Sequence, residues 1–195
     1  MMPTLNEAIR QRYACRDFDA GRPPTAEQLR LLLEAGRLAP SSFGLEPWRF
    51  IAVTGVARRG AVARACFDQP AAQTAPALVV IIALVAALDP AADYVRDRLA
   101  AEARGQDPAP IHAAYRAFHH PDSIGAWAVG QCNFAAAHML LQAAHMGLGS
   151  CPIGGFDEVA LAAALDLPPG ETPALVIAAG PCRHAAPERV RKPLG

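Results

Sequence analysis

The sequence predicts an α+β fold in which a sheet of apolar strands is covered by helices. Two stretches, residues 49–54 and 77–84, are rich in β-branched and aliphatic side chains, which favours strands. The second stretch is apolar throughout, as expected of a strand that is buried on both faces. The longest apolar stretch, residues 123–146, predicts instead a long central helix.

Two helices near the N-terminus carry the same start signal, a capping box. Thr4 and Glu7 predict a short helix that runs to about Arg12, and Thr25 and Gln28 predict a second helix. Leucines recur on one side of the second helix, which gives it an apolar face.

The segment 90–119 is polar and alanine-rich, and its pattern predicts two short surface helices separated by a break at residues 105–110. The helix predicted for residues 123–146 is long enough to span a membrane. Five polar side chains interrupt it, namely Gln131, Asn133, His138, Gln142 and His145. Because such groups are unfavourable in lipid, we expect a helix of a soluble protein that ends at Gly147.

The C-terminal part predicts a strand over residues 149–153, a helix over 157–167, a turn at 168–170 and a strand over 173–179. The basic tail that follows has few residues suited to a core. We therefore expect it either to dock on another part of the protein or to stay loose.

The composition limits the classes of function. We expect a single domain over residues 1–195, and balanced charges, with 18 Lys and Arg against 18 Asp and Glu, argue against nucleic-acid or membrane partners. The N-terminus lacks the apolar stretch of a signal peptide. The cysteines are scattered at positions 15, 66, 132, 151 and 182, without zinc or redox-motif spacing. This predicts reduced thiols, no metal site and a cytoplasmic location.

Three clusters stand out because each contains more basic or turn-forming residues than a connector needs. They are "RYACRDF" at residues 12–18, "LAPSSFGLEPWRFIAV" at residues 38–53, and "CPIGGF" at residues 151–156, with Arg189 and Arg191 in the tail. Taken singly, each has a structural explanation. Arginines after a helix complement its dipole, exposed arginines pair with nearby aspartates such as Asp17 or Asp19, and two glycines after a strand form a tight turn.

In this order along the chain, the three clusters resemble the nitroreductase family of FMN-dependent flavoproteins that are reduced by NADH or NADPH. The most specific match is "PSSFGLEPWRF", where the family shows Pro-Ser-Ser-x-Asn-x-Gln-Pro-Trp-x-Phe. The resemblance covers nearly the whole chain. It implies a central mixed, mostly antiparallel sheet flanked by helices, in an interlocked homodimer with FMN at the interface.

The resemblance also implies roles for the matching positions. Three arginines would hold the FMN phosphate (Arg12, Arg189 and Arg191), and Arg16 would lie near the pyrimidine edge of the flavin and tune it. The serine loop would contact the flavin of the other subunit, with Trp48 packed behind it. The complete set expected to bind the cofactor is Arg12, Tyr13, Ala14, Arg16, Pro40, Ser41, Ser42, Gly44, Gln69, Pro152, Ile153, Gly154, Gly155, Arg189 and Arg191.

The sequence departs from the family pattern at several of these positions. Ala14 stands where a serine is usual, Gly44 where an asparagine is common, and Glu46 where a glutamine is common. Gly154 replaces an acidic residue of some members, and only the first glutamine of a Gln-Pro-Gln stretch is kept, as Gln69. These departures leave the expected phosphate site intact.

The implied activity is a ping-pong transfer of hydride from NADH or NADPH through flavin N5 to a nitroaromatic, a quinone or a similar electron-poor small molecule. It needs no protein nucleophile. Two alternatives stay open: a narrow reductase of an enone or small aldehyde, and a relative that binds or consumes flavin without general reductase turnover. Tyr115 and Phe118 form either an aromatic lid over the acceptor or ordinary packing.

Overall fold

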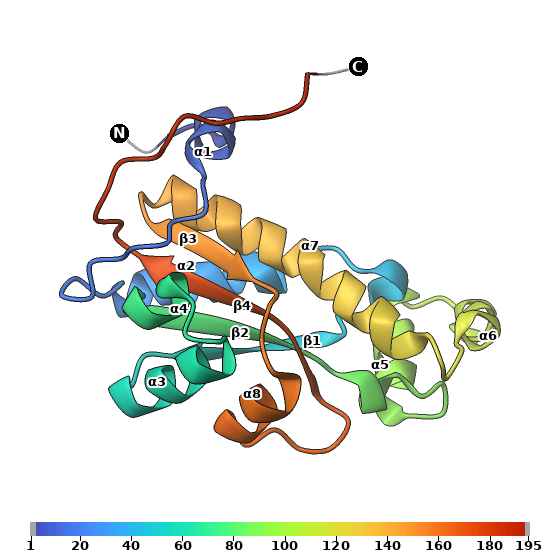
Figure 1. The fold of residues 1–195 in the computed structure, drawn as a ribbon. Helices are drawn as coiled ribbons and strands as arrows, with labels where there is room; N and C mark the ends of the chain where they lie inside the picture. Colours follow the sequence, from blue (N-terminus) through green and yellow to red (C-terminus); the bar gives the residue numbers. More distant parts are fainter. Residues whose placement is uncertain (1–2, 194–195) are drawn as a thin grey trace.

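The computed structural model describes residues 3–193 and is built around a four-stranded sheet (Figure 1). Its strands are β1 (Trp48–Val53), β2 (Ala77–Ala83), β3 (Gly149–Ile153) and β4 (Thr172–Gly180), in the order β1-β2-β4-β3. Val80, in the middle of β2, lies opposite Ile51 on one side and Val176 on the other. Both predicted apolar runs thus form strands, and the continuous one occupies the inside of the sheet.

Helices cover both faces of the sheet. They are α1 (Leu5–Gln11), α2 (Ala26–Arg37), α3 (Val56–Ala65), α4 (Pro70–Thr74), α5 (Asp93–Glu102), α6 (Ala109–Phe118), α7 (Ile124–His145) and α8 (Glu158–Ala164), with short 3-10 turns η1 (Ser42–Gly44) and η2 (Val85–Leu88). Side chains of β2 alternate between two clusters: Val79 and Ile81 pack with α2 and α7, and Leu78 and Val80 pack toward α3, α4 and α8. Figure 1 shows α7 above the sheet and α3 and α8 below it.

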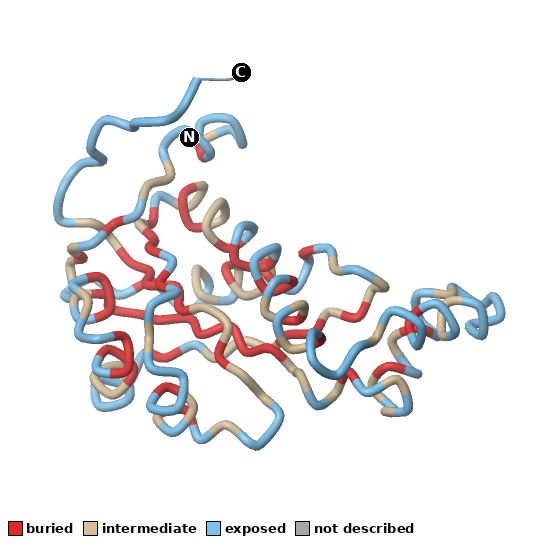
Figure 2. The backbone as a smooth tube through the Cα atoms, turned by 45° about the vertical axis from the view of Figure 1, so that its right-hand side comes forward, coloured by how far each residue is buried: buried red, intermediate tan, exposed pale blue. Residues whose placement is uncertain are grey.

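Burial follows this layering. Every residue of β2 is buried, as is one side of α7, whereas the C-terminal tail is exposed (Figure 2). Both predicted capping boxes are present, at Thr4 and at Thr25, and Gly147 ends α7 with a φ of 71°. Within residues 3–193, no helix combines the length and apolar character that a membrane crossing needs.

Four expectations about the elements need correction. The ladder is antiparallel throughout rather than mixed, and the parallel pairing among residues 3–193 is an isolated bridge between Ala14 and Ser150. The segment 90–119 is not confined to the surface, because Leu99 and Tyr115 are fully buried in the core. The last helix ends at Ala164, not at 167, since Asp166 takes a left-handed φ of 53°. Helices α3 and α4 were not predicted.

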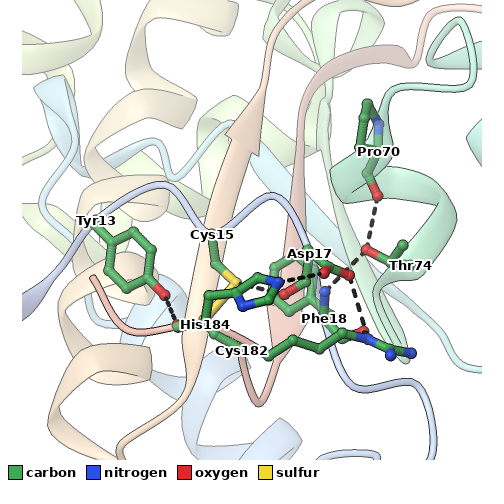
Figure 3. Close-up of a disulfide and its surroundings, with 9 residues drawn as sticks. Tyr13, Cys15, Asp17, Phe18, Pro70, Thr74, Cys182 and His184 are labelled. Carbon is green, nitrogen blue, oxygen red and sulfur yellow. Dashed lines mark hydrogen bonds and ion pairs between the residues drawn. A yellow bond between two sulfur atoms is a disulfide. The ribbon is translucent and has the colours of Figure 1, made fainter. Parts of the chain in front are cut away.

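The expectation of five free thiols is also wrong. Cys15 and Cys182 form a disulfide between positions 167 residues apart (Figure 3). A Cβ on Gly149 would overlap the sulfur of Cys182, so the strand needs a glycine there to leave room for the bond. Cys66, Cys132 and Cys151 are free and buried. The cytoplasmic location inferred from reduced thiols therefore loses part of its basis and stays a prediction.

Candidate functional site

The N-terminal cluster lies along β3, at an edge of the sheet. After α1 the chain becomes extended, and the backbone N–H of Cys15 donates to the carbonyl of Ser150 at 3.1 Å. Over the next residues the side chains alternate as in a strand: Cys15 is buried, whereas Ala14 and Arg16 on either side of it are exposed. This alternation places Arg16 on the open side of the sheet edge.

The start of the tail is fastened to the same segment (Figure 3). The Tyr13 hydroxyl donates to the carbonyl of His184 at 2.9 Å, and the His184 ring lies 3.1 Å from a carboxylate oxygen of Asp17. Phe18 pairs with Cys182 in an antiparallel bridge. The tail therefore docks on residues 12–18 through its first residues, while residues 185–193 are exposed and have no regular structure.

Four arginines from these two segments line one hollow of about 630 Å³. They are Arg12, Arg16, Arg189 and Arg191; Arg10 of α1 lines the same hollow, as do the acidic residues Asp17 and Glu188. Burial lowers the pKa of Arg12, and the charges of Arg189 and Arg191 lower it further. Arg189 donates to the backbone carbonyl of Arg12. Among residues 3–193, no carboxylate pairs with any of the four. Crowded guanidinium groups without a counter-ion are suited to binding an anion.

An adjoining hollow of about 410 Å³ shares Arg12, Tyr13 and His184 with the first. Ser150 also lines it, and its hydroxyl is buried without a hydrogen-bond partner among the described residues. An unpaired buried hydroxyl is unusual in a folded protein.

The end of β3 exposes backbone. Gly154 and Gly155 are exposed, neither has a positive φ, and an added Cβ would meet no atom nearer than 3.8 Å at Gly154 and 3.5 Å at Gly155. The fold itself therefore does not require glycine at these positions. Gln69, just before α4, donates to the carbonyl of Gly155 at 2.7 Å. Ile153 is 2% exposed, so it can offer a ligand only its backbone.

The serine loop lies elsewhere in the chain. The backbone N–H of Ser42 donates to the side chain of Gln131 in α7 at 2.9 Å, and Ser41 accepts from the backbone N–H of Glu46 at 2.8 Å. Trp48 is 6% exposed and packs in the core, as predicted. Gln131 lies about 20 Å along α7 from the end of that helix, next to which the arginines gather. Figure 1 shows η1 and the segment 12–18 near opposite ends of α7.

The structure thus brings together most of the expected cofactor-binding residues in two groups. Residues 12–16, 189 and 191 share one hollow, and Gln69 joins the glycines after β3. Pro40, Ser41, Ser42 and Gly44 form a separate group. The expectations missed three side chains that hold the serine loop, Tyr94, Arg98 and Gln131, because they are distant in sequence and carry no motif.

Tyr115 and Phe118, the aromatic residues considered as a lid, differ in their exposure to solvent. Tyr115 is fully buried, its hydroxyl donates to the carbonyl of Leu88 at 2.6 Å, and burial raises its pKa to about 12. Tyr115 is therefore a packing residue. Phe118 is 44% exposed and stays a candidate for contact with an acceptor. Both rings lie 5.4 Å from the ring of Phe43, measured between centroids.

The described residues contain neither a candidate metal site nor a free cysteine with a lowered pKa. The described residues contain no group of three or more His, Cys, Asp or Glu side chains that could hold a metal ion. Burial raises the pKa of Cys151, which lies near Arg16 and Arg12, and it raises those of Cys66 and Cys132 to about 11 and about 12. Such thiols stay neutral and are weak nucleophiles near neutral pH.

Comparison with known proteins adds a family context. A model of the Nitroreductase family matches residues 9–181. A Thermus thermophilus protein named NADH dehydrogenase is 34% identical over 168 residues, covering 85% of this chain and 81% of that protein. An oxygen-insensitive NADPH nitroreductase of Helicobacter acinonychis is 28% identical over 192 residues, covering 96% of this chain and 91% of that protein.

Solved structures share the fold. A nitroreductase-like protein of Streptococcus mutans has a TM-score of 0.85 at 22% identity, covering 96% of this chain and 93% of that chain. A protein of Exiguobacterium sibiricum, crystallised in complex with FMN, has a TM-score of 0.82 at 22% identity, covering 99% and 95%.

Proposed function

The chain belongs to the nitroreductase family, and from this premise we propose that it is an FMN-dependent NAD(P)H oxidoreductase. Its acceptors in this proposal are nitroaromatics, quinones or similar electron-poor small molecules. The observation that carries the proposal is the hollow lined by five arginines, none of which has a carboxylate partner among residues 3–193. FMN bound to a protein of the same fold supports the choice of cofactor.

The residues of the hollow fit a phosphate monoester. The planar forked donors of Arg12, Arg189 and Arg191 match phosphate oxygens, and the dianion would offset the repulsion that, after burial, lowers the pKa of Arg12. The unpartnered hydroxyl of Ser150 lies beside this group. No Gly-x-Gly-x-x-Gly motif follows a strand in the sequence, so the site is proposed for FMN rather than for a dinucleotide flavin.

The remaining groups would serve the flavin ring. When bound, FMN supplies an N5 atom that takes hydride from the nicotinamide and passes it to the acceptor. Arg16 would stand near the pyrimidine edge, where a fixed cation stabilises negative charge on the reduced ring. The exposed backbone at Gly154 and Gly155 would allow close approach near N5, held in place by Gln69. In this proposal the side chains position the flavin and polarise its ring, and none acts as a nucleophile.

A homodimer completes the proposed site. Within one chain the serine loop and the arginine hollow lie near opposite ends of α7, so one flavin meets both only if Ser41 and Ser42 come from a second copy. The outer face of α7 offers a surface for that copy. It carries small residues, Gly130 and Ala137, beside Phe134, which is 49% exposed. Residues 1–195 act as one FMN-binding domain in this proposal.

The proposal is tested on the purified full-length protein. We expect about one non-covalent FMN per chain by mass spectrometry of released cofactor. The yellow flavin absorbance should bleach when NADH or NADPH is added without oxygen, and return when a quinone or nitroarene follows. Retention of FAD, or no flavin after reconstitution with FMN, contradicts the cofactor.

Two further results would separate the alternatives. FMN that does not bleach with either nicotinamide points to a flavin-binding or flavin-consuming protein. Bleaching without reoxidation by quinones and nitroarenes, but with reoxidation by an enone or small aldehyde, points to the narrow reductase.

A further inference from the structure

The serine loop holds a backbone that most residues avoid. Phe43 and Glu46 have left-handed φ values of 59° and 43°, on either side of Gly44 at 62° and Leu45. Left-handed conformations of residues other than glycine persist only where their surroundings impose them. The contacts that impose this conformation therefore decide where the loop places Ser41 and Ser42.

Hydrogen bonds within the loop satisfy some of its backbone donors. The N–H of Gly44 donates to the carbonyl of Ser41 at 3.1 Å, and that of Leu45 donates to the carbonyl of Ser42 at 3.3 Å. The carbonyl groups of Gly44 and Leu45 accept from side chains outside the loop, and that of Glu46 accepts both from such a side chain and from the backbone N–H of Trp48, at 2.6 Å.

Helix α5 supplies those partners. The Tyr94 hydroxyl lies 2.8 Å from the carbonyl of Leu45 and 2.7 Å from that of Glu46. Arg98, one turn further along, donates from Nε and Nη2 to the carbonyl of Gly44 at 3.0 and 2.8 Å. The same guanidinium pairs with the Glu46 carboxylate. Two side chains thus hold three successive carbonyl groups and the one acidic side chain of the loop.

The approach of α5 is close, and α7 holds the opposite side. A Cβ on Gly44 would lie 2.5 Å from a carboxylate oxygen of Glu102, so the exposed Glu102 side chain would have to move aside, and the left-handed φ of 62° itself favours glycine there. From α7, buried Gln131 accepts from the N–H of Ser42. The loop is fixed between two helices, so contacts from α5 and α7, and not the loop sequence alone, determine its conformation.

We infer that Arg98, assisted by Tyr94, is a positioning residue that fixes the serine loop in the conformation needed to meet the flavin of the second subunit. The inference rests on the proposed function. Arg98 touches neither cofactor nor acceptor in this scheme. It keeps the loop organised before the flavin arrives, so that binding does not have to order it.

The test compares Arg98→Ala with Arg96→Ala in the full-length protein. Arg96 lies on the same helix but is exposed and pairs only with Asp93 and Asp97 among the described residues, which makes it a matched control. Hydrogen exchange of the peptide covering residues 41–46 should be at least tenfold faster in Arg98→Ala and unchanged in Arg96→Ala. This readout needs no flavin.

The second readout is the FMN dissociation constant, measured by quenching of flavin fluorescence. We expect it to rise at least tenfold in Arg98→Ala, to stay within twofold in Arg96→Ala, and to recover partly in Arg98→Lys, which keeps the charge but not the fork. With FMN saturating, the rate of flavin reduction by NADH or NADPH should return to that of the unaltered protein. If Arg98→Ala does not fold, Tyr94→Phe removes one hydroxyl and should shift both readouts in the same direction.

Unchanged exchange in Arg98→Ala overturns the inference, and so does faster exchange with an unchanged FMN dissociation constant. If the unaltered protein binds no FMN, the proposed function fails and the inference about flavin fails with it. If hydrogen exchange of residues 41–46 is still faster in Arg98→Ala, the result shows only that α5 stabilises the loop conformation, with no role in binding flavin.

Discussion

Whether Arg16 is free to contact a ligand depends on whether the nearby aspartates, Asp17 and Asp19, pair with it or with other cations. Asp17 lies 3.3 Å from Arg183, and Asp19 lies 2.6 Å from Arg22. The interpretation in which Arg16 merely pairs with one of these two aspartates is therefore wrong. It instead lines the hollow that it shares with four other arginines.

Replacing Arg16 by alanine should lower the midpoint potential of bound flavin. A cation near the pyrimidine edge favours the reduced ring over the neutral oxidised one, and losing about 1.4 kcal/mol of that interaction shifts a two-electron couple by roughly 30 mV. Potentials are measured by anaerobic dye titration at full FMN occupancy. Arg189→Ala is the control, since it should weaken FMN binding with little change in potential. Equal potentials in Arg16→Ala and the unaltered protein would exclude a tuning role.

Glu46 could not be interpreted from the sequence alone. It was a departure from the family pattern, and its partner Arg98 lies 52 positions further along the chain. The motif could identify the loop because its prolines and serines are adjacent. It could not identify what holds the loop, because a single arginine on a polar helix carries no signal.

Among the elements, those with strong local signals were the ones that could be predicted. Helices α1 and α2 start with capping boxes, and β2 is a run of seven buried apolar residues. Helix α3 starts at Val56 after the N-cap residue Gly55, which provides no side-chain cap, and α4 has only five residues. Neither offers a pattern that differs from a loop, so tertiary packing decides both.

Helix α7 presents an outer stripe that the described residues leave uncovered. Ala126, Gly130, Phe134 and Ala137 follow one another at helical spacing and are exposed. Small residues let a second helix approach closely, and the phenylalanine adds apolar area.

Phe134→Glu should therefore convert the proposed dimer to a monomer at micromolar concentration and release most of the FMN. A carboxylate buried without a partner at the interface disfavours association. Light scattering combined with flavin absorbance measures both effects. Val159→Glu, an exposed apolar position on α8 with 80% exposure, should leave both unchanged. A monomeric Phe134→Glu variant that still holds FMN tightly would argue against a site shared between subunits.

At the scale of the whole molecule, segments near the two ends of the chain, residues 12–18 and 182–184, meet beside β3. The sequence predicted four strands, their helical cover and the segments of the candidate site. It could not predict that Cys15 and Cys182 join, because 167 residues separate them and only the completed sheet brings them together. The antiparallel ladder has the same origin, since strand direction depends on the full topology.

Reducing this disulfide should lower the free energy of unfolding by about 5 kcal/mol in the chain-entropy model, given a closed loop of 167 residues. Urea denaturation with and without dithiothreitol measures the difference. The Cys15→Ser variant should match the reduced protein under both conditions. A reduced protein as stable as the oxidised one would show that the bond adds nothing to the contacts around Phe18 and Tyr13.

The disulfide closes residues 15–182 into a covalent loop, from which a short N-terminal segment extends at Cys15 and a short C-terminal segment extends at Cys182. The C-terminal segment carries Arg189 and Arg191, and the N-terminal segment carries Arg12. A single cut anywhere between the two cysteines opens the covalent loop but yields no separate fragment. The arginines proposed to hold the phosphate therefore stay covalently connected through the disulfide even after the chain has been cut between the two cysteines.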